Sequence, residues 1–395
     1  MMSRSARFLA VVGASAVLMG SAACDVPPVQ AAQEPSSVEL VHPPDGGIQP
    51  QVAMDADGGV HLLYFKGDPA HGDLFYARRN RDGRFSSPMR VNAHVGSAIA
   101  TGSIRGGHLA IGRNGRVHVA WPGSSEALPR LAGQRTPVLY TRMNDARTGF
   151  EPERNVVQLP VDLDGGAIAA DPAGHVFVAW HAGPPGAPDE ANRRIWIARS
   201  TDDGRTFAKD VPVSDPGVGA CGCCGIGAVA DRQGRLFMLF RSATAMVHRD
   251  TYLLSSRDAG LTFASRKVQD WTIGACPMST FSVTDSVGGP LAAWETDGQV
   301  HWARVDPVSS TLSAVVTPPG TDKGRKHPAV AANGRGETIL AWAEGTSWNK
   351  GGAVAWQVFR KDGTPTAVRG RVDGVPAWGL VATVARADGG FTIVY

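Results

Sequence analysis

The 395-residue sequence has few charged residues, and those it has nearly cancel. Asp, Glu, Lys and Arg make up 19% of the chain, and the formal net charge is +3. No run rich in Lys and Arg occurs. Binding to nucleic acid depends on such basic patches, so we expect no nucleic-acid partner. Long hydrophobic runs are also missing, since no stretch beyond the N-terminus is long enough to cross a bilayer. The composition predicts a globular protein, which we expect to be a monomer.

The first 24 residues are typical of an export signal. A basic start precedes an apolar run, residues 8–18, that is too short for a transmembrane helix. Residues 20–24, GSAAC, resemble a bacterial lipobox in which Cys24 is lipidated, and they fit ordinary cleavage after a small residue equally well. Residues 25–37 are rich in Pro, Gln and Ala and indicate a linker. We therefore expect an exported protein, either periplasmic, extracellular or held at a bacterial membrane by an N-terminal lipid anchor alone.

A repeated hairpin pattern runs through the rest of the chain. Seven times an apolar run is followed by a turn with Asp or Asn before Gly, and then by a second apolar run. The turns lie at residues 57–58, 114–115, 171–174, 231–234, 285–288, 333–334 and 388–389. Asn, Asp and Gly tolerate the positive φ of a tight reversal, so these are hairpin signals. They recur at roughly 50–60 residues, and such a period indicates a propeller or an array.

The pattern also predicts the blades and how their ring closes. After most hairpins a third apolar run and a looser fourth run follow, which gives four antiparallel strands per blade, a to d from the axis outward. The seventh hairpin ends the chain, and residues 37–41 form a strand without a hairpin of their own. Pairing the two would close the ring and remove exposed edges. The sequence thus predicts an all-β fold, a single β-propeller over residues 38–395. We favour seven blades with a short closing blade, and six is the alternative.

Two predicted c–d turns share one motif. Residues 200–207 read STDDGRTF and residues 256–263 read SRDAGLTF. In such a turn the Ser and Asp side chains bind backbone, Gly supplies the unusual φ, and the aromatic packs between sheets. The motif, S-x-D-x-G-x-T-F, resembles the Asp box of sialidase-like (BNR-repeat) propellers, and degenerate copies lie at residues 80–85 and 361–363. The resemblance covers nearly the whole mature chain. It implies that the Asp boxes lie on the face opposite the active site.

The resemblance also implies a type of site. Sialidases clamp the substrate carboxylate with three arginines, and use a Tyr nucleophile and an Asp acid/base. Here Arg105, Arg241 and Arg325 are the candidate clamp, because each lies near a d–a or b–c loop. The first-blade F-R-I-P motif is absent, with GIQPQ at residues 47–51 in its place. The tyrosines fall within strands or at the last residue, so the nucleophile is not found and exo-α-sialidase activity is not expected to carry over unchanged.

The d–a and b–c loops of a propeller share one face around the axis, and on this chain they are rich in charge, His and Trp. Such a face suits a polar ligand or a carbohydrate. Glu295 and Asp250 are candidates for an acid/base, and Arg241 and Glu295 occupy equivalent positions in adjacent blades, where they would face each other. The further substrate-binding candidates are His181, His327 and Trp348. The leading hypothesis is a propeller that acts on or recognises a glycan or a small anionic substrate, as a glycoside hydrolase; the alternative is a non-catalytic binding or scaffold propeller.

Four cysteines of the mature chain, Cys221, Cys223, Cys224 and Cys276, all fall in predicted d–a loops. In an exported protein an even set indicates disulfides first, and Cys276 would join one of the other three and connect two neighbouring blades. A metal site is the alternative. Three thiolates plus Cys276, with Met278 and a His nearby, would suit copper(I) or zinc. We favour disulfides and no cofactor, and the third functional alternative is a periplasmic protein that binds metal through thiols.

Overall fold

The structure is a computed structural model. Contacts within the chain divide it into residues 1–35 and residues 36–395. Within the second unit the structure describes residues 36–55, 57–80, 82–102, 106–159, 163–184, 189–320 and 323–395. The predicted signal, Cys24, most of the linker and Arg105 lie outside the described residues. No helix in the described ranges is long and apolar enough to cross a membrane.

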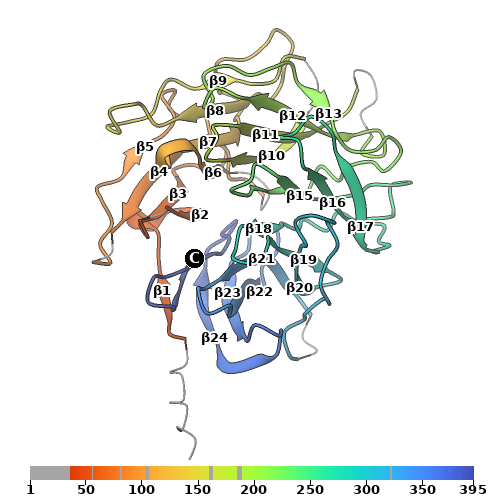
Figure 1. Ribbon diagram of the computed structural model, residues 1–395. Coiled ribbons are helices and arrows are strands. Elements are labelled where there is room, and N and C mark those ends of the chain that lie inside the picture. Colours follow the sequence, from red (N-terminus) through yellow and green to blue (C-terminus); the bar gives the residue numbers. More distant parts are fainter. Residues whose placement is uncertain are drawn as a thin grey trace, which may run out of the picture. The chain divides into compact units, whose positions relative to one another are not determined.

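The described chain forms seven sheets that follow one another around a ring (Figure 1). Their strands, in chain order, make up blades 1 to 6 and the closing blade 7. The strands of blades 1 to 3 are β2 (Ile48–Met54), β3 (Val60–Lys66), β4 (Asp73–Arg79) and β5 (Met89–Arg90); β6 (His108–Ile111), β7 (Val117–Pro122), β8 (Val138–Arg142) and β9 (Arg154–Asn155); and β10 (Leu163–Ala170), β11 (Val176–Ala182), β12 (Arg194–Ser200) and β13 (Val211–Pro212). The strands of blades 4 to 6 are β14 (Gly227–Ala230), β15 (Leu236–Arg241), β16 (Thr251–Ser256) and β17 (Ala264–Gln269); β18 (Ser282–Thr284), β19 (Leu291–Thr296) and β20 (Gln299–Arg304); and β21 (Arg325–Ala332), β22 (Thr338–Glu344), β23 (Gly352–Phe359) and β24 (Pro365–Val375). Two single 3-10 turns complete the elements, η1 (Pro44–Gly46) and η2 (Arg113–Gly115).

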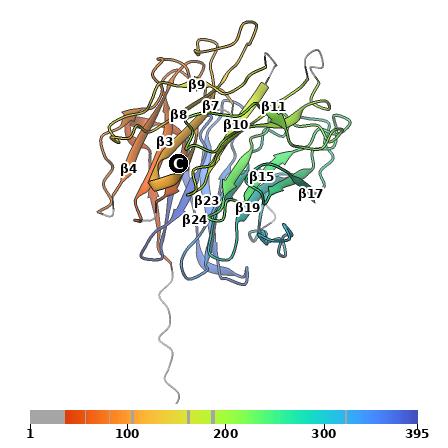
Figure 2. The same cartoon turned by 45° about the horizontal axis from the view of Figure 1, so that its top comes forward.

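Within blades 1 to 6 each strand pairs antiparallel with the next, as the hairpin pattern predicts. Blade 5 has three regular strands, and an antiparallel bridge between Trp302 and Val316 places a fourth segment at its outer edge. The first strands of the blades surround the axis, and later strands lie progressively further out (Figures 1 and 2). Loops from strand d to the next strand a, and from strand b to strand c, therefore meet on one face, which we call the axial face. The opposite face carries the Asp boxes and is called the Asp-box face.

Blade 7 closes the ring with strands from both ends of the described chain. Its hairpin consists of β25 (Ala382–Ala385) and β26 (Phe391–Val394), and β1 (Val38–Val41) pairs with β26 in parallel, with Val38 opposite Phe391. The predicted closure and the short last blade are thereby confirmed. Seven blades are formed, so the six-blade alternative is wrong. Closure satisfies strand edges that would otherwise remain open to other chains.

The hydrophobic core is divided among the seven junctions between neighbouring blades, with one cluster at each. Strand β15 shows the cause. Alternate side chains of a strand point to opposite faces of its sheet. Met238 and Phe240 pack toward blade 3, whereas Phe237 and Leu239 pack toward blade 5. Both faces of an inner sheet are buried, and this explains the continuous apolar runs in the sequence.

Candidate functional site

The loop from β13 to β14 carries three of the cysteines on the axial face, and its backbone is fixed by its surroundings. Neighbouring loops and strands accept hydrogen bonds from three of its amides. These run from Cys221 N to the Arg241 carbonyl (2.9 Å), from Gly222 N to Glu190 Oε1 (2.6 Å) and from Gly225 N to the Ser279 carbonyl (2.9 Å). Residues of blades 3, 4 and 5 therefore hold this loop in one conformation.

The three sulfurs of this loop lie together. Cys221 Sγ is 3.2 Å from Cys223 Sγ and 3.4 Å from Cys224 Sγ, and all three sulfurs lie within 4.8 Å of one another. A disulfide would require about 2.05 Å. All four cysteines of the described residues are free thiols, and Cys276 is exposed and outside the group. The predicted disulfides are therefore not found. The tight C-x-C-C turn gathers three sulfurs without disulfide geometry, and the loop of Cys276 leaves its thiol in solvent.

Basic side chains surround the three thiols, and two of them are paired with acids. Arg249 Nη1 lies 2.7 Å from Glu190 Oε2, and Arg193 Nη1 lies 3.1 Å from Asp164 Oδ2. Arg241 has no exposed surface. The immediate surroundings of the sulfurs thus combine positive charge with burial.

These surroundings distinguish the thiols from one another. Burial alone would raise the pKa of Cys224, but contacts from the other two thiols and the charge of Arg241 outweigh it and hold this pKa well below its ordinary value. Contact with the Cys221 sulfur raises the pKa of Cys223. Cys224 is therefore the thiol of the group that ionises first.

Two buried histidines lie near enough to Cys224 for its charge to act on their pKa, although both are outside the group of three sulfurs. His181 donates from Nδ1 to the Asp164 carbonyl (3.0 Å), which leaves Nε2 unprotonated, buried and without a hydrogen-bond partner. Burial lowers the pKa of His181. Burial also lowers the pKa of His327 to about 3, and its Nδ1 lies 3.3 Å from Thr280 Oγ1. Both imidazoles are neutral at neutral pH.

Arg241 and Glu295, expected to face each other, are in contact across blades 4 and 5, but through backbone. Arg241 donates from Nη2 to the carbonyl of Glu295 (2.6 Å) and from Nη1 to the carbonyl of Arg249 (2.7 Å). Its guanidinium lies over the rings of Trp271 and Phe281, at 4.7 and 5.3 Å from their centroids. This arginine braces two blades. The Glu295 carboxyl is buried, and burial raises its pKa despite the charges of Lys326 and Arg241.

The other predicted site residues are also held by their surroundings. Arg325 donates to the carbonyls of Pro318 and Pro319 at 3.4 and 3.0 Å, and lies over the ring of Trp342. Asp250 Oδ1 accepts the amide of Trp271 at 2.9 Å. Its other oxygen lies 3.5 Å from Lys267 of the outer strand β17, so this carboxylate faces the blade edge. A substrate clamp and an acid/base role for these residues stay predictions.

A shallow depression on the axial face lies between blades 5, 6 and 7 and includes two of the predicted binding residues, Trp348 and His327. It is lined by Met278, Lys326, His327, Thr346, Ser347, Trp348, Lys350, Trp378 and Gly379. The Trp348 side chain is largely exposed, at 57%. Thr346 Oγ1 and Trp378 Nε1 are buried atoms without a hydrogen-bond partner. The depression thus offers an aromatic surface and two lysines to a ligand, and two unpartnered polar atoms are buried in its wall.

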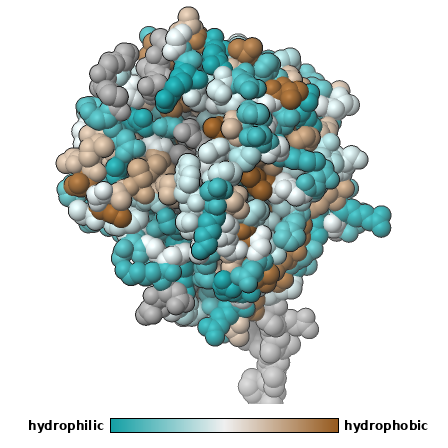
Figure 3. All heavy atoms as spheres, turned by 180° about the vertical axis from the view of Figure 1, so that it is seen from behind, coloured by the Kyte–Doolittle hydropathy of each residue, from teal (hydrophilic) through white to brown (hydrophobic). Residues whose placement is uncertain are grey.

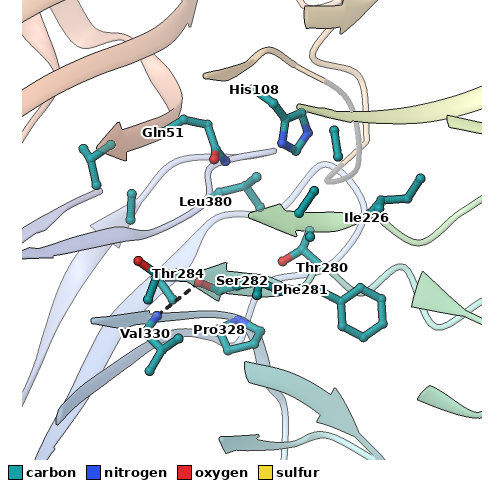
Figure 4. Close-up of a pocket in the computed structure, with 18 of the residues that line it drawn as sticks. Gln51, His108, Ile226, Thr280, Phe281, Ser282, Thr284, Pro328, Val330 and Leu380 are labelled. Carbon is teal, nitrogen blue, oxygen red and sulfur yellow. Dashed lines mark hydrogen bonds between the residues drawn. The ribbon is translucent and has the colours of Figure 1, made fainter. Parts of the chain in front are cut away.

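The axis itself holds a cavity of about 140 Å³, lined by the innermost strands (Figure 4). Most of its lining residues are apolar, but polar atoms supply the larger part of the exposed wall, and Gln51, His108 and Thr280 are among the polar side chains. Ser282 Oγ in the wall accepts the amide of Val330 at 3.3 Å. Gly225 and Ile226, which follow directly on Cys224, are part of the same wall. The cysteine loop therefore borders the mouth of the axial cavity.

No protein-family model matches the sequence, and a comparison with curated proteins finds no similar sequence. Solved structures do match. A Hadza microbial sialidase is similar at a TM-score of 0.50 and 14% identity, over 83% of this chain and 74% of that one. An α-L-arabinanase from Penicillium chrysogenum matches at a TM-score of 0.54 and 12% identity, over 84% of this chain and 100% of the other. An α-L-arabinofuranosidase from Fusarium graminearum matches at a TM-score of 0.55 and 12% identity, over 83% of this chain and 98% of the other.

The fold of the chain is therefore that of a sialidase-like β-propeller. At these identities the likeness concerns the fold, and the Asp boxes are the sequence signal that predicted it. In this sialidase-like propeller, sequence reasoning missed Glu190, Arg193 and Thr346. All three lie in b–c loops, so a complete inventory of those loops would have included them. Their contacts across blades could not be read from the sequence.

Proposed function

We propose that the axial face of this sialidase-like propeller binds an acidic carbohydrate, with the depression around Trp348 as its contact site. The observation that carries the proposal is the exposed indole of Trp348 beside Lys326 and Lys350. Support also comes from solved structures of this fold, which include sialidases, an arabinanase and an ulvan lyase.

The chemistry of the depression explains the choice of ligand. An indole stacks on the apolar face of a sugar ring and contributes through its large area. Lys326 and Lys350 supply positive charge for a carboxylate or sulfate group. Lys326 Nζ also donates to the carbonyl of Pro277 at 2.6 Å, which holds it at the rim.

The proposal is one of recognition, and the geometry gives the reason. Hydrolysis by a sialidase mechanism needs arginines free to bind the substrate carboxylate and a Tyr nucleophile. Arg241 and Arg325 donate to backbone carbonyls and are buried. Tyr64 and Tyr140 are buried within their strands. Following the N-terminal signal, we propose that the protein meets its carbohydrate outside the cytoplasm.

Binding to an array of oligosaccharides that carry carboxylate or sulfate groups tests the proposal. We expect Trp348→Ala to weaken binding to the best acidic oligosaccharide by about tenfold, the loss expected for one aromatic contact. Binding should also weaken with added salt, because Lys350 is exposed to solvent and Lys326 is only partly buried.

The matched control is Leu261→Ala. Leu261 is also an exposed apolar side chain, at 68%, but it lies in an Asp-box turn on the opposite face. Its removal should leave binding unchanged. The proposal fails if no acidic oligosaccharide binds, or if Leu261→Ala weakens binding as much as Trp348→Ala.

A further inference from the structure

The three-cysteine loop has a second feature that carbohydrate binding does not use, which is a set of sulfurs already gathered around one point. Cys221 and Cys224 have no exposed surface, whereas Cys223 is half-buried. The sulfurs lie 3.2 and 3.4 Å apart, and all lie within 4.8 Å of one another. Their positions need little change to reach a single ion, and the half-buried sulfur gives such an ion a path from solvent.

We propose that Cys221, Cys223 and Cys224 form a binding site for one copper(I) ion. Thiolate sulfur is a soft ligand and selects soft metals such as copper(I). Copper(I) accepts three sulfur ligands in a plane, whereas structural zinc is almost always bound by four ligands. Among the described residues the group contains three sulfurs, and Cys276 lies exposed outside it. The number of donors therefore favours copper(I).

The surroundings of the loop independently support a bound ion. The backbone amides of the loop are fixed by Arg241, Glu190 and Ser279, so the sulfurs are held in place before any metal arrives. His181 beside Cys224 presents an unprotonated, fully buried Nε2 without a partner. This nitrogen lies outside the group of three sulfurs, so His181 borders the site without adding a fourth ligand.

The charges around the group suit an anionic metal site. Three thiolates with one copper(I) ion carry two net negative charges, and a buried excess of this kind requires compensation. Arg241 lies among the buried side chains here, and Arg249 and Arg193 extend from the neighbouring loops. The arginines that are unavailable to a substrate in this region can thus stabilise the thiolates.

The test is an anaerobic titration of the fully reduced chain with copper(I) in the presence of the chromogenic chelator bicinchoninate. We expect one ion per chain, bound tightly enough to be withdrawn from the chelator, together with a sulfur-to-copper charge-transfer absorption. Replacing any one of the three, as in Cys223→Ser, should weaken binding more than the 10–100-fold typical of losing an outer-shell partner.

Cys276→Ser is the matched control, because it removes a thiol of the same chain outside the group, and it should bind copper(I) as the wild type does. Cys223 is the least buried of the three, and circular dichroism shows whether its variant is folded; if it is not, Cys221→Ser and Cys224→Ser replace it. Equal uptake by Cys223→Ser and wild type, loss of uptake in Cys276→Ser, or binding of zinc in preference to copper(I) would each overturn the proposal. These outcomes are independent of carbohydrate binding, which is measured on copper-free protein.

Discussion

Most of the charged residues predicted to bind substrate on the axial face instead form contacts within the protein. Arg241 and Arg325 each lie over an aromatic ring and donate to backbone carbonyls. The sequence placed both near loops of this face, and that placement is correct. The sequence could not show which groups accept their hydrogen bonds. Those acceptors are backbone carbonyls of other blades or of irregular loops, and every residue type has such a carbonyl.

Glu295 is the residue for which the structure predicts a clear pH effect. Its pKa is raised because it is buried, and Oε2 has no hydrogen-bond partner. The folded chain therefore holds this proton more tightly than the unfolded chain does. The contribution of Glu295 to stability falls as pH rises from about 4.5, the ordinary value for Glu, through the raised folded pKa. We expect Glu295→Gln to raise the free energy of unfolding at pH 7 by about 1–3 kcal/mol, the cost of a buried group without a partner, with little difference from wild type below pH 4. Denaturant unfolding at a series of pH values measures this.

Glu337 is a control of opposite sign. Burial alone would raise its pKa, but hydrogen bonds from Ser36, Asn333 and Arg335 outweigh it and lower this pKa. Glu337→Gln should therefore lose stability at pH 7. If Glu295→Gln is destabilised at pH 7 to the same extent, the carboxylate is favourably bound and the interpretation of its burial is wrong.

Among the elements, the Asp-box turns are predicted best from sequence because every contact that defines them is local. In the first box Ser200 Oγ donates to Asp202 Oδ1 (2.7 Å) and accepts the amide of Gly204 (2.9 Å). Gly204 has φ of +73°, and an added Cβ would lie 1.8 Å from the Tyr140 hydroxyl of blade 2. Phe207 packs edge-on against the ring of Tyr140, with centroids 4.8 Å apart. The turn thus joins two blades while its own geometry is fixed by eight consecutive residues.

The cysteine loop is the opposite case. Its sequence identified the cluster but suggested disulfides, since spacing alone does not tell where each sulfur points. The conformation depends on Arg241, Glu190 and Ser279, which lie up to tens of residues away along the chain. Contacts between distant segments decide such a loop, and they become visible only after the propeller has placed blades 3, 4 and 5 side by side (Figure 1).

The Asp-box turn allows a prediction about stability in acid. Burial would raise the pKa of Asp202, but donors from Thr206 and Ser200 outweigh it and lower this pKa to about 2. The stabilisation is complete above about 3.8, the ordinary value, and is lost as pH falls toward 2. We expect Asp202→Ala to lower the melting temperature at pH 7. The difference in melting temperature from wild type should shrink as pH falls from 4 to 2, and calorimetry measures it.

Asp215→Ala is the comparison for this variant, because Asp215 is an exposed Asp outside the turns. The melting temperature of Asp215→Ala should equal that of the wild type at each pH. If the melting temperature of Asp202→Ala stays below that of wild type by the same amount between pH 7 and pH 2, the carboxylate charge does not stabilise the turn.

For the molecule as a whole, the repeat predicted the architecture because each blade repeats the same local pattern. The pairing of β1 with β26 was foreseen from an unpartnered strand and an incomplete hairpin. Because the blades form a ring, the d–a and b–c loops gather on the axial face and the Asp-box turns gather on the opposite face. Hydrophobic residues seen from behind the view of Figure 1 form scattered spots among hydrophilic ones (Figure 3). On the face seen in this view, no large apolar patch marks a binding site.

If the axial face binds the ligand and the Asp-box face serves the fold, a bound ligand should protect the first face and leave the second unchanged. Hydrogen–deuterium exchange, measured with and without a saturating acidic oligosaccharide, tests it most directly because it reports on both faces at once. We predict slower exchange in residues 345–351 and 376–381, the segments that carry Trp348 and Trp378 of the depression, and unchanged exchange in residues 200–207 and 256–263. Slower exchange confined to the Asp-box turns, or none on either face, would contradict it.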